Sequence, residues 1–279
     1  MSQQTEYFAR AIRAEALRMV HRINASHIGS SLSMGDLLAV LYASVLRVDP
    51  ARPDWPERDR FILSKGHGAA IAYAALAQAG FFPLEELASY CRDGSRLAGH
   101  LTAGVPGVEF STGSLGHGLP VGCGLALAAK RDSAPWRVYV LLSDGELDEG
   151  SNWEAILFAP HHQLENLVAI VDYNKIQSFG RVSEVLALEP LAAKWRAFGW
   201  AVREIDGHDH DAIEDALRAV PFELGRPSAI IAHTIKGKGV GFMEDQLAWH
   251  YKSPDDAQLA RALAELGMPE MPEMPGRGE

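Results

Sequence analysis

Two short polar segments, each directly after a run of apolar residues, are the strongest chemical signal in this sequence. Asp144 and Gly145 follow the run RVYVLLS at 137–143, and Asn174 follows the run NLVAIVD at 166–172. Carboxylate and amide oxygens are ligands that Mg²⁺ and Ca²⁺ prefer, and these ions often keep phosphates as further ligands. A glycine beside them lets a diphosphate approach the backbone. The pattern therefore indicates a divalent metal that bridges the protein to an anionic cofactor.

An ordinary turn is the alternative explanation for Asp144-Gly145, because Asp-Gly is a common turn dipeptide. The second apolar run ends in Asn174 at a matching depth. Two polar ends on successive strands favour the metal site over a turn that has no chemical role.

The elements that must position these residues alternate between strands and helices. Apolar runs predict strands at 61–63, 137–143, 166–172, 200–205 and 228–233. Helices are predicted at 3–24, 33–46, 67–79, 116–130, 151–161 and 209–220. Such alternation predicts an α/β fold with a central parallel sheet and helices on both faces. Ligands of such sheets bind outside the carboxyl ends of the strands, where both polar segments would lie.

Local signals refine this outline. Ser33 with Asp36 and Ser151 with Glu154 have the spacing of helix capping boxes. Residues 91–116 are rich in Gly and Ser and are interpreted as a long functional loop. We expect one domain over residues 1–266, followed by a flexible tail at 267–279, where proline punctuates the sequence.

Bulk properties exclude several classes of protein. The formal net charge of −10 argues against a nucleic-acid-binding face. No apolar run is long enough to span a membrane, and the N-terminus lacks the apolar stretch of a signal peptide. Cys91 and Cys123 form no CxxC pair, so neither a zinc site nor a disulfide framework is indicated. We expect a cytoplasmic chain with no nucleic-acid or membrane partner.

Longer segments resemble a known family. SDGELDEGSNWEA at 143–155, followed by YNKI at 173–176, resembles the thiamine-diphosphate motif, with Ser143 in place of its first Gly. Over roughly residues 5–255, the chain resembles the diphosphate-binding (PP) domain of transketolases. The other segments that carry this resemblance, in the family's order, are ASHIGSSLSMGD (25–36), LSKGHGA (63–69), AGH (98–100), STGSLGHG (111–118) and TIKGKGV (234–240).

This resemblance implies thiamine diphosphate and a divalent ion, Mg²⁺ or else Ca²⁺ or Mn²⁺. Asp144 and Asn174 would bind the metal through their side chains, and Ile176 through its backbone carbonyl. Leu115 would place an apolar wall beside the thiazolium ring, where a low dielectric favours its reaction. The implied cofactor contacts are His67, Gly113, Ser114, Leu115, Gly145, Glu149, Asn174, Ile176 and His250.

Four histidines resemble those of the family's substrate channel. They are His27, His67, His100 and His250, and the resemblance implies hydrogen bonds to sugar hydroxyls and proton transfer. Taken singly, each fits a loop residue that bonds local backbone. Other polar residues are less clear from the sequence. His161, His162 and the pair His208 and His210 are interpreted as surface residues; Ser114 and His117 replace the family's usual Pro and Gln; Lys236 and Lys238 fit either a phosphate contact or a solvated loop.

The resemblance also implies a partner. In the family, a second domain carries the glutamate that activates the pyrimidine of the cofactor and the pocket for that ring. We expect a separate C-terminal subunit to supply them, in an α2β2 heterotetramer that acts on sugar substrates. Other interpretations are the α-subunit of a 2-oxo acid dehydrogenase, a fragment like 1-deoxyxylulose-5-phosphate synthase, and an inactive regulator. The ketose donor stays open between an ordinary sugar phosphate and a sulfo- or branched sugar.

Overall fold

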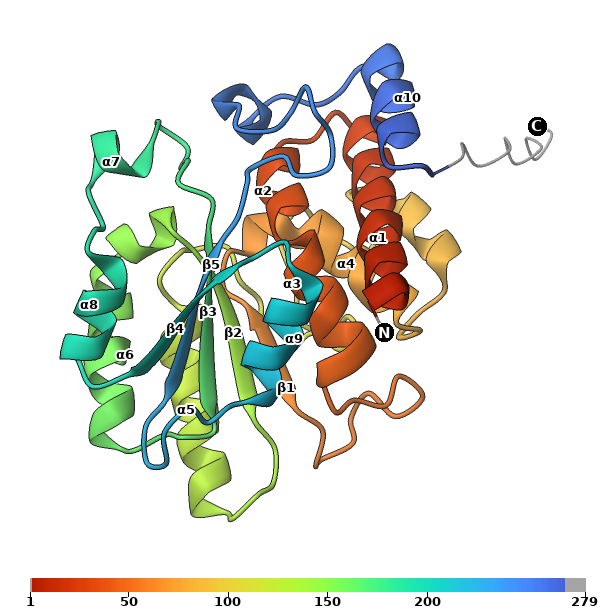
Figure 1. The fold of residues 1–279 in the computed structure, drawn as a ribbon. Helices are drawn as coiled ribbons and strands as arrows, with labels where there is room; N and C mark the ends of the chain where they lie inside the picture. Colours follow the sequence, from red (N-terminus) through yellow and green to blue (C-terminus); the bar gives the residue numbers. More distant parts are fainter. Residues whose placement is uncertain (1, 269–279) are drawn as a thin grey trace.

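A five-stranded parallel sheet forms the centre of the computed structural model, which describes residues 2–268 (Figure 1). The strand order is β1-β2-β3-β5-β4, and every neighbouring pair is parallel. Each strand lies within one residue of its predicted run. The strands are β1 Arg60–Leu63, β2 Val138–Ser143, β3 Leu167–Tyr173, β4 Ala201–Asp206 and β5 Ser228–His233.

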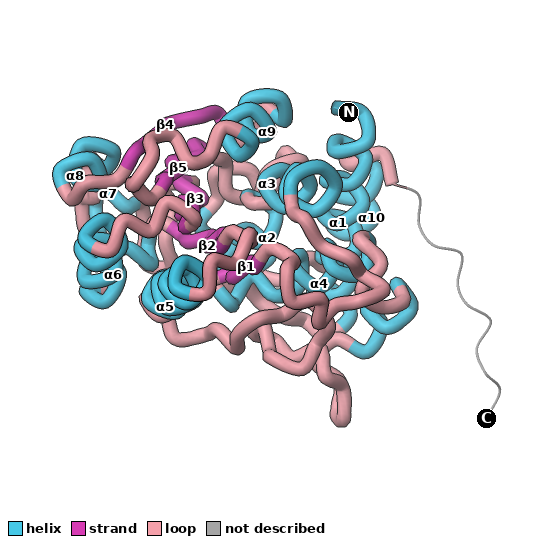
Figure 2. The backbone as a smooth tube through the Cα atoms, turned by 90° about the horizontal axis from the view of Figure 1, so that it is seen from below, coloured by secondary structure: helices cyan, strands magenta, loops and turns pink. Residues whose placement is uncertain are grey.

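Helices cover both faces of the sheet, which confirms the predicted fold class. Successive strand residues point to opposite faces, so Tyr139 and Leu141 join one apolar core while Val138 and Val140 join the other. Figures 1 and 2 show α5, α6 and α8 on one side and α1, α3 and α9 on the other. The helices are α1 Ser2–Arg22, α2 Ile28–Ser33, α3 Gly35–Val40, α4 Ala69–Gln78, α5 Gly118–Arg131, α6 Gly150–His161, α7 Val182–Val185, α8 Leu191–Ala197, α9 His210–Arg218 and α10 Asp256–Glu265.

The predicted helix at 33–46 is wrong in its start and in its regularity. Helical structure already begins at Ile28, breaks at Met34, and continues through α3 into a π-helical turn at Leu41–Val45. Apolar residues continue across the break, so their spacing does not reveal it. The short helices α7, α8 and α10 were not predicted either, because their runs are brief.

Both predicted capping boxes are wrong, because the two serine hydroxyls bind other groups. Ser33 Oγ donates to Ser30 O at 3.1 Å and to Asp172 Oδ2 at 2.5 Å. Ser151 Oγ donates to Gly116 O at 2.7 Å, and Glu149 precedes α6 without a side-chain cap. These serines therefore hold the segments around the sheet edge rather than helix ends.

The long loop is confirmed. No helix or strand lies between the 3₁₀ segment Leu84–Ser89 and α5. The loop returns to the carboxyl end of β1, where Leu101 N donates to Gly66 O at 3.2 Å and Thr112 Oγ1 donates to Leu63 O at 2.8 Å. Its last residues are thereby fixed beside the ends of β1 and β2.

The end of the chain is described only in part. α10 is followed by Gly267 and Met268, and the rest of the predicted tail, residues 269–279, lies outside the described residues. Across residues 2–268, no helix combines the length and the apolar character needed to cross a membrane.

Two glycines of α5 test how tightly this helix packs on the sheet. A Cβ at Gly122 would lie 2.6 Å from Val140 Cγ2, whereas a Cβ at Gly124 would meet no atom within 4 Å. We expect Gly122→Ala to lower the free energy of unfolding by about 1–3 kcal/mol through overpacking. Gly124→Ala should raise it by up to about 1 kcal/mol, since alanine favours the helix. Urea denaturation of both variants measures this difference, and equal effects would contradict the close packing.

Candidate active site

The two polar segments meet at the carboxyl ends of neighbouring strands. β2 and β3 pair in parallel with Ser143 opposite Asp172. Asp144 therefore follows one strand end while Asn174 follows the other. The Asp144 carboxylate reaches across, because its Oδ2 accepts a hydrogen bond from Lys175 N at 2.5 Å. The predicted adjacency of these segments is confirmed.

A cavity of about 270 Å³ opens at this point. Ser114 and Glu149, two of the residues predicted to contact the cofactor, do not line it and are exposed. A Cβ on Gly116 would lie 2.7 Å from Glu149 Cβ, so Glu149 covers the neighbouring loop instead. The predicted residues that line the cavity are His27, His67, His100, Gly113, Leu115, Asp144, Gly145, Asn174, Ile176 and His250.

Further lining residues were missed from the sequence. They have no motif of their own and reach the cavity through neighbours that do. They are Ser30, Ser143, Gln177, Ser178, Lys236 and Tyr251, of which only Lys236 was considered as a phosphate contact.

The four predicted histidines gather at one side of the cavity. The ring centroid of His27 lies 5.1 Å from that of His67, 5.2 Å from that of His250 and 6.3 Å from that of His100. These residues come from four separate segments of the chain. Their convergence argues against four independent loop residues that each bond local backbone.

An unusual backbone conformation places His27 in this cluster. Its φ angle is 72°, in the left-handed region that residues other than glycine seldom adopt. The conformation is held by hydrogen bonds on both sides: His27 N donates to His250 O at 2.8 Å, and His27 O accepts from Ser31 N at 3.1 Å. Backbone strain of this kind is concentrated at functional sites, which favours a functional role for His27.

Three of the clustered histidines, His27, His67 and His250, are uncharged at neutral pH. Burial, with His100 and Lys236 nearby, lowers the pKa of His27 to about 4. Burial and the charge of Lys236 lower the pKa of His250 to about 3. Burial also holds the pKa of His67 well below its usual range, as does Lys65. A neutral imidazole has one donor and one acceptor nitrogen, so each of these rings can bind a hydroxyl group.

The oxygen atoms at the strand ends fit a divalent cation. Asp144 Oδ1 accepts from Gly145 N at 2.7 Å, and Asn174 Oδ1 accepts from Ile176 N at 3.2 Å. Burial, and then the charge of Asp172, raise the pKa of Asp144 to about 6. A cation at this carboxylate would favour its charged form and oppose that rise. Among the described residues, no group of three or more His, Cys, Asp and Glu offers another metal site.

Lys236 is buried at this site, so the interpretation of its surroundings as a solvated loop is wrong. The residue is 1% exposed, and Nζ donates to Ile176 O at 2.8 Å. Nζ also lies 2.9 Å from His250 Nδ1. The carbonyl of Ile176 is therefore already in contact with a positive charge. Lys238, by contrast, lies 3.9 Å from Glu244 and does not line the cavity.

A buried ion pair lies beneath the cavity. Lys65 Nζ donates to Asp172 Oδ2, and both residues are 0% exposed. Burial alone would raise the pKa of Asp172, but the Lys65 ammonium and hydrogen bonds from Lys65, Ser33 and Thr234 hold it below its ordinary value. The pair was missed from the sequence, although Lys65 lies within the segment LSKGHGA.

Glu146 fixes the loop that contributes Gly113 and Leu115. Its buried carboxylate accepts hydrogen bonds from Ser64 Oγ at 2.5 Å and from Gly116 N at 2.9 Å. Its second oxygen accepts from Ser143 N at 3.3 Å. Its position two residues after Asp144 was a signal in the sequence, but nothing indicated its partners.

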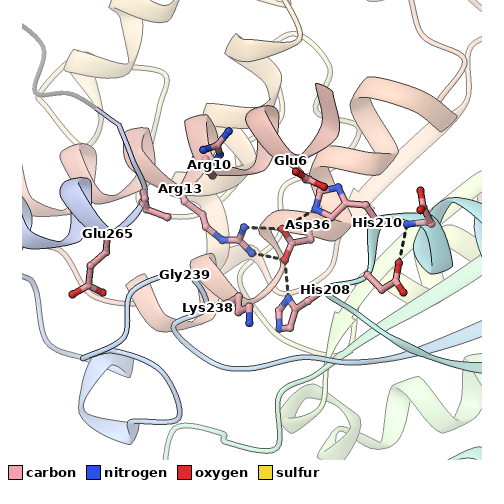
Figure 3. Close-up of a pocket in the computed structure, with 12 residues that line it drawn as sticks. Glu6, Arg10, Arg13, Asp36, His208, His210, Lys238, Gly239 and Glu265 are labelled. Carbon is pink, nitrogen blue, oxygen red and sulfur yellow. Dashed lines mark hydrogen bonds and ion pairs between the residues drawn. The ribbon is translucent and has the colours of Figure 1, made fainter. Parts of the chain in front are cut away.

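His208 and His210 are not surface residues, which corrects the sequence interpretation. Their side chains are 11% and 9% exposed, and both contact the Asp36 carboxylate (Figure 3). This cluster lies outside the cavity. His161 is exposed and its ring lies against that of His162, as expected at the surface.

Comparison with known proteins decides the family. The model described as transketolase, thiamine diphosphate binding domain, matches residues 4–275. The chain belongs to the transketolase family. A 6-deoxy-6-sulfo-D-fructose transketolase subunit from Clostridium sp. (strain MSTE9) is 44% identical over 95% of this chain and 98% of its own length. One of the two subunits of an apulose-4-phosphate transketolase from Phocaeicola vulgatus is 42% identical over 91% of this chain and 90% of its own length.

Solved transketolases share the fold. The enzyme from Leishmania mexicana has a TM-score of 0.89 and 33% identity, and the match covers 95% of this chain but 41% of that one. The enzyme from Campylobacter jejuni has a TM-score of 0.87 and 31% identity, with 42% of its chain covered. The chain thus spans about two fifths of these transketolases, yet nearly the whole of the separate transketolase subunits.

The buried pair gives a stability prediction for this transketolase chain. Lys65→Met leaves the Asp172 charge buried without its ammonium partner, which should cost about 3–5 kcal/mol of unfolding free energy. The matched variant Lys175→Met, at an exposed position, should cost less than about 1 kcal/mol. Replacing Asp172 by Asn as well should recover part of the loss. Urea denaturation checks all three, and equal losses for the two single variants would contradict the prediction.

Proposed function

We propose that this chain is the N-terminal subunit of a two-subunit transketolase that transfers a two-carbon ketol unit from a ketose to an aldose. The observation that carries the proposal is the joining of two sets of groups in one cavity: oxygen ligands at the ends of β2 and β3, and four imidazoles beside them. Among the alternatives raised by the sequence, the family match favours this one.

The proposed cofactor is thiamine diphosphate with Mg²⁺ or a similar divalent ion. Asp144, Asn174 and the Ile176 carbonyl would hold the metal, since all three offer the hard oxygen atoms that such ions prefer. Gly145, His67, Gly113 and His250 line the same cavity and would contact the cofactor. The proposed roles of Ser114 and Glu149 need a position nearer the cavity than they have here. Bound thiamine diphosphate supplies a carbon that carries the ketol unit between donor and acceptor.

The histidines have a separate proposed task. His27, His67, His100 and His250 would bind the sugar hydroxyls and accept or return a proton at the hydroxyl that reacts. The lowered pKa values of His27, His67 and His250 keep these three uncharged and able to do both at neutral pH. Leu115 lines the same cavity, on the loop that Glu146 holds, and would shield the thiazolium ring from water.

A partner chain is part of the proposal because this cavity holds half of the required groups. Asp144 is the only carboxylate among the described residues that line it, and it belongs to the metal end. The glutamate that activates the pyrimidine ring must therefore come from elsewhere. Two similar proteins are named as transketolase subunits, which supports a separate C-terminal subunit. We propose an α2β2 heterotetramer with the cofactor held between unlike subunits.

The substrate is proposed only as a class, a ketose that carries an anionic group. One similar subunit is named for a sulfo-sugar and another for a branched-sugar phosphate. These names favour a modified ketose over xylulose 5-phosphate without choosing between the two.

Reconstitution tests the function. We expect this chain alone to show no ketol transfer, and its complex with the cognate C-terminal subunit to consume a ketose donor in the presence of thiamine diphosphate and Mg²⁺. A coupled assay with 6-deoxy-6-sulfo-fructose, apulose 4-phosphate and xylulose 5-phosphate identifies the donor. Full turnover by the isolated chain would contradict the need for a partner, and a complex that uses no ketose would contradict the assignment.

The metal ligand is tested by binding. We expect Asp144→Asn in the complex to raise the Kd for thiamine diphosphate about 100-fold or more, because the site loses its charged ligand. Calorimetry at a series of Mg²⁺ concentrations measures this, and the variant should also lose its dependence on Mg²⁺. Asp132→Asn, at the exposed end of α5, is the matched control and should bind as the wild type does. Unchanged affinity in Asp144→Asn would contradict the metal site.

A further inference from the structure

A buried carboxylate on α3 collects donors from three other parts of the chain. Asp36 is 5% exposed and accepts two hydrogen bonds from Arg13 on α1, each at 2.7 Å. His208 Nδ1 lies 2.7 Å from Asp36 Oδ2, and His210 Nε2 lies 3.1 Å from Asp36 Oδ1. Figure 3 shows these three side chains converging on Asp36. All four residues lie outside the proposed cofactor cavity.

The second nitrogen of His208 points to a different partner. His208 Nε2 accepts a hydrogen bond from Ile235 N at 2.8 Å. A backbone N–H is always the donor, so Nε2 carries no proton. The proton of the neutral ring is therefore on Nδ1, which donates to Asp36. His208 thus connects a buried acid to one backbone amide, with the tautomer set by both contacts.

Asp36 is well suited to hold this tautomer. Burial alone would raise its pKa, but the Arg13 guanidinium and hydrogen bonds from Arg13, His208 and His210 hold it well below the ordinary value. Asp36 therefore stays ionised at neutral pH and acts only as an acceptor. An acceptor at Nδ1 requires the proton there and leaves Nε2 free for the amide.

The amide that His208 holds lies next to Lys236. On the preceding side, Thr234 Oγ1 donates to Asp172 and Thr234 N donates to Tyr173 O. On the following side, Lys236 reaches into the cavity and contacts Ile176 O and His250. Gly237 N then donates to Gly29 O at 3.0 Å. The His208 contact is thus the anchor that fixes the backbone directly before Lys236.

We propose that His208 is a positioning residue that, oriented by Asp36, fixes the Ile235 amide and so places the Lys236 ammonium for the diphosphate of the cofactor. This role rests on the proposed function, because the diphosphate is the group expected beside Asp144 and Lys236. His208 itself does not line the cavity. Its effect reaches the site through one hydrogen bond and one peptide unit.

Two substitutions separate the two contacts of His208. In His208→Gln, the side-chain oxygen occupies the place of Nε2 and can accept from Ile235 N, while the contact with Asp36 is lost. In His208→Asn, the shorter amide can donate to Asp36 in place of Nδ1, while the acceptor for Ile235 is lost. A role limited to satisfying Asp36 would make the glutamine variant the worse of the two. A positioning role makes the asparagine variant worse.

The first measurement needs no cofactor. Hydrogen–deuterium exchange at the Ile235 amide of this chain in complex with its C-terminal subunit should be at least about tenfold faster in His208→Asn, because an unmade hydrogen bond of about 1.4 kcal/mol no longer protects it. His208→Gln should exchange within about threefold of the wild type, within that same spread of hydrogen-bond energies. Equal exchange in the wild type and His208→Asn would overturn the proposal.

The second measurement is binding of thiamine diphosphate with Mg²⁺ to the complex. We expect His208→Asn to raise the Kd about tenfold, with kcat at saturating cofactor within about twofold of the wild type, since a hydrogen bond of this size positions a binding group only. In a Lys236→Met background, His208→Asn should raise the Kd no further, because the residue that it positions is gone. An additional loss of about tenfold in that background would overturn the route through Lys236.

These outcomes are distinct from failure of the proposed function. If the wild-type complex binds no thiamine diphosphate, the proposed function is wrong, and the positioning role for the diphosphate falls with it. If the wild type binds the cofactor and His208→Asn binds it equally well, the proposed function stands and the positioning role alone is wrong.

Discussion

The structure around the cavity depends on one buried charge, the carboxylate of Asp172. It accepts hydrogen bonds from Lys65 after β1, from Ser33 at the end of α2 and from Thr234 after β5. Three segments are thereby tied to the end of β3, and each continues into a part of the cavity. A buried charge of this kind is tolerated only when its partners are complete, so the charge requires the segments to stay together. The same charge contributes to the raised pKa of Asp144, which a divalent cation would reverse.

The sheet and most of the site could be predicted from the sequence for a physical reason. Parallel strands buried on both faces are continuous apolar runs, so β2, β3 and β5 were recognisable, and the residues after them had to share one edge. The clustering of His27, His67, His100 and His250 was expected only from the family resemblance. It depends on contacts between four distant segments, which spacing along the chain does not encode.

The wrong predictions have a shared cause. Ser33 and Ser151 fit a local capping rule, but tertiary acceptors, Asp172 and Gly116 O, compete for their hydroxyls. His208 and His210 resembled surface residues because their partner, Asp36, lies 172 and 174 positions away along the chain. Lys65 and Lys236 are buried cations that hydrophobicity assigns to the surface. Polar groups are placed by partners, and partners are known only once the fold is known.

The carboxylate of Glu146 has one more consequence for how the molecule works. It belongs to the same turn as Asp144, yet it binds the backbone at Gly116 and the hydroxyl of Ser64. The turn that receives the charged tail of a cofactor and the loop that faces its ring are therefore mechanically one piece. A ligand that displaces the first must carry the second with it, so the cavity is built to recognise the whole length of a cofactor rather than its two ends separately.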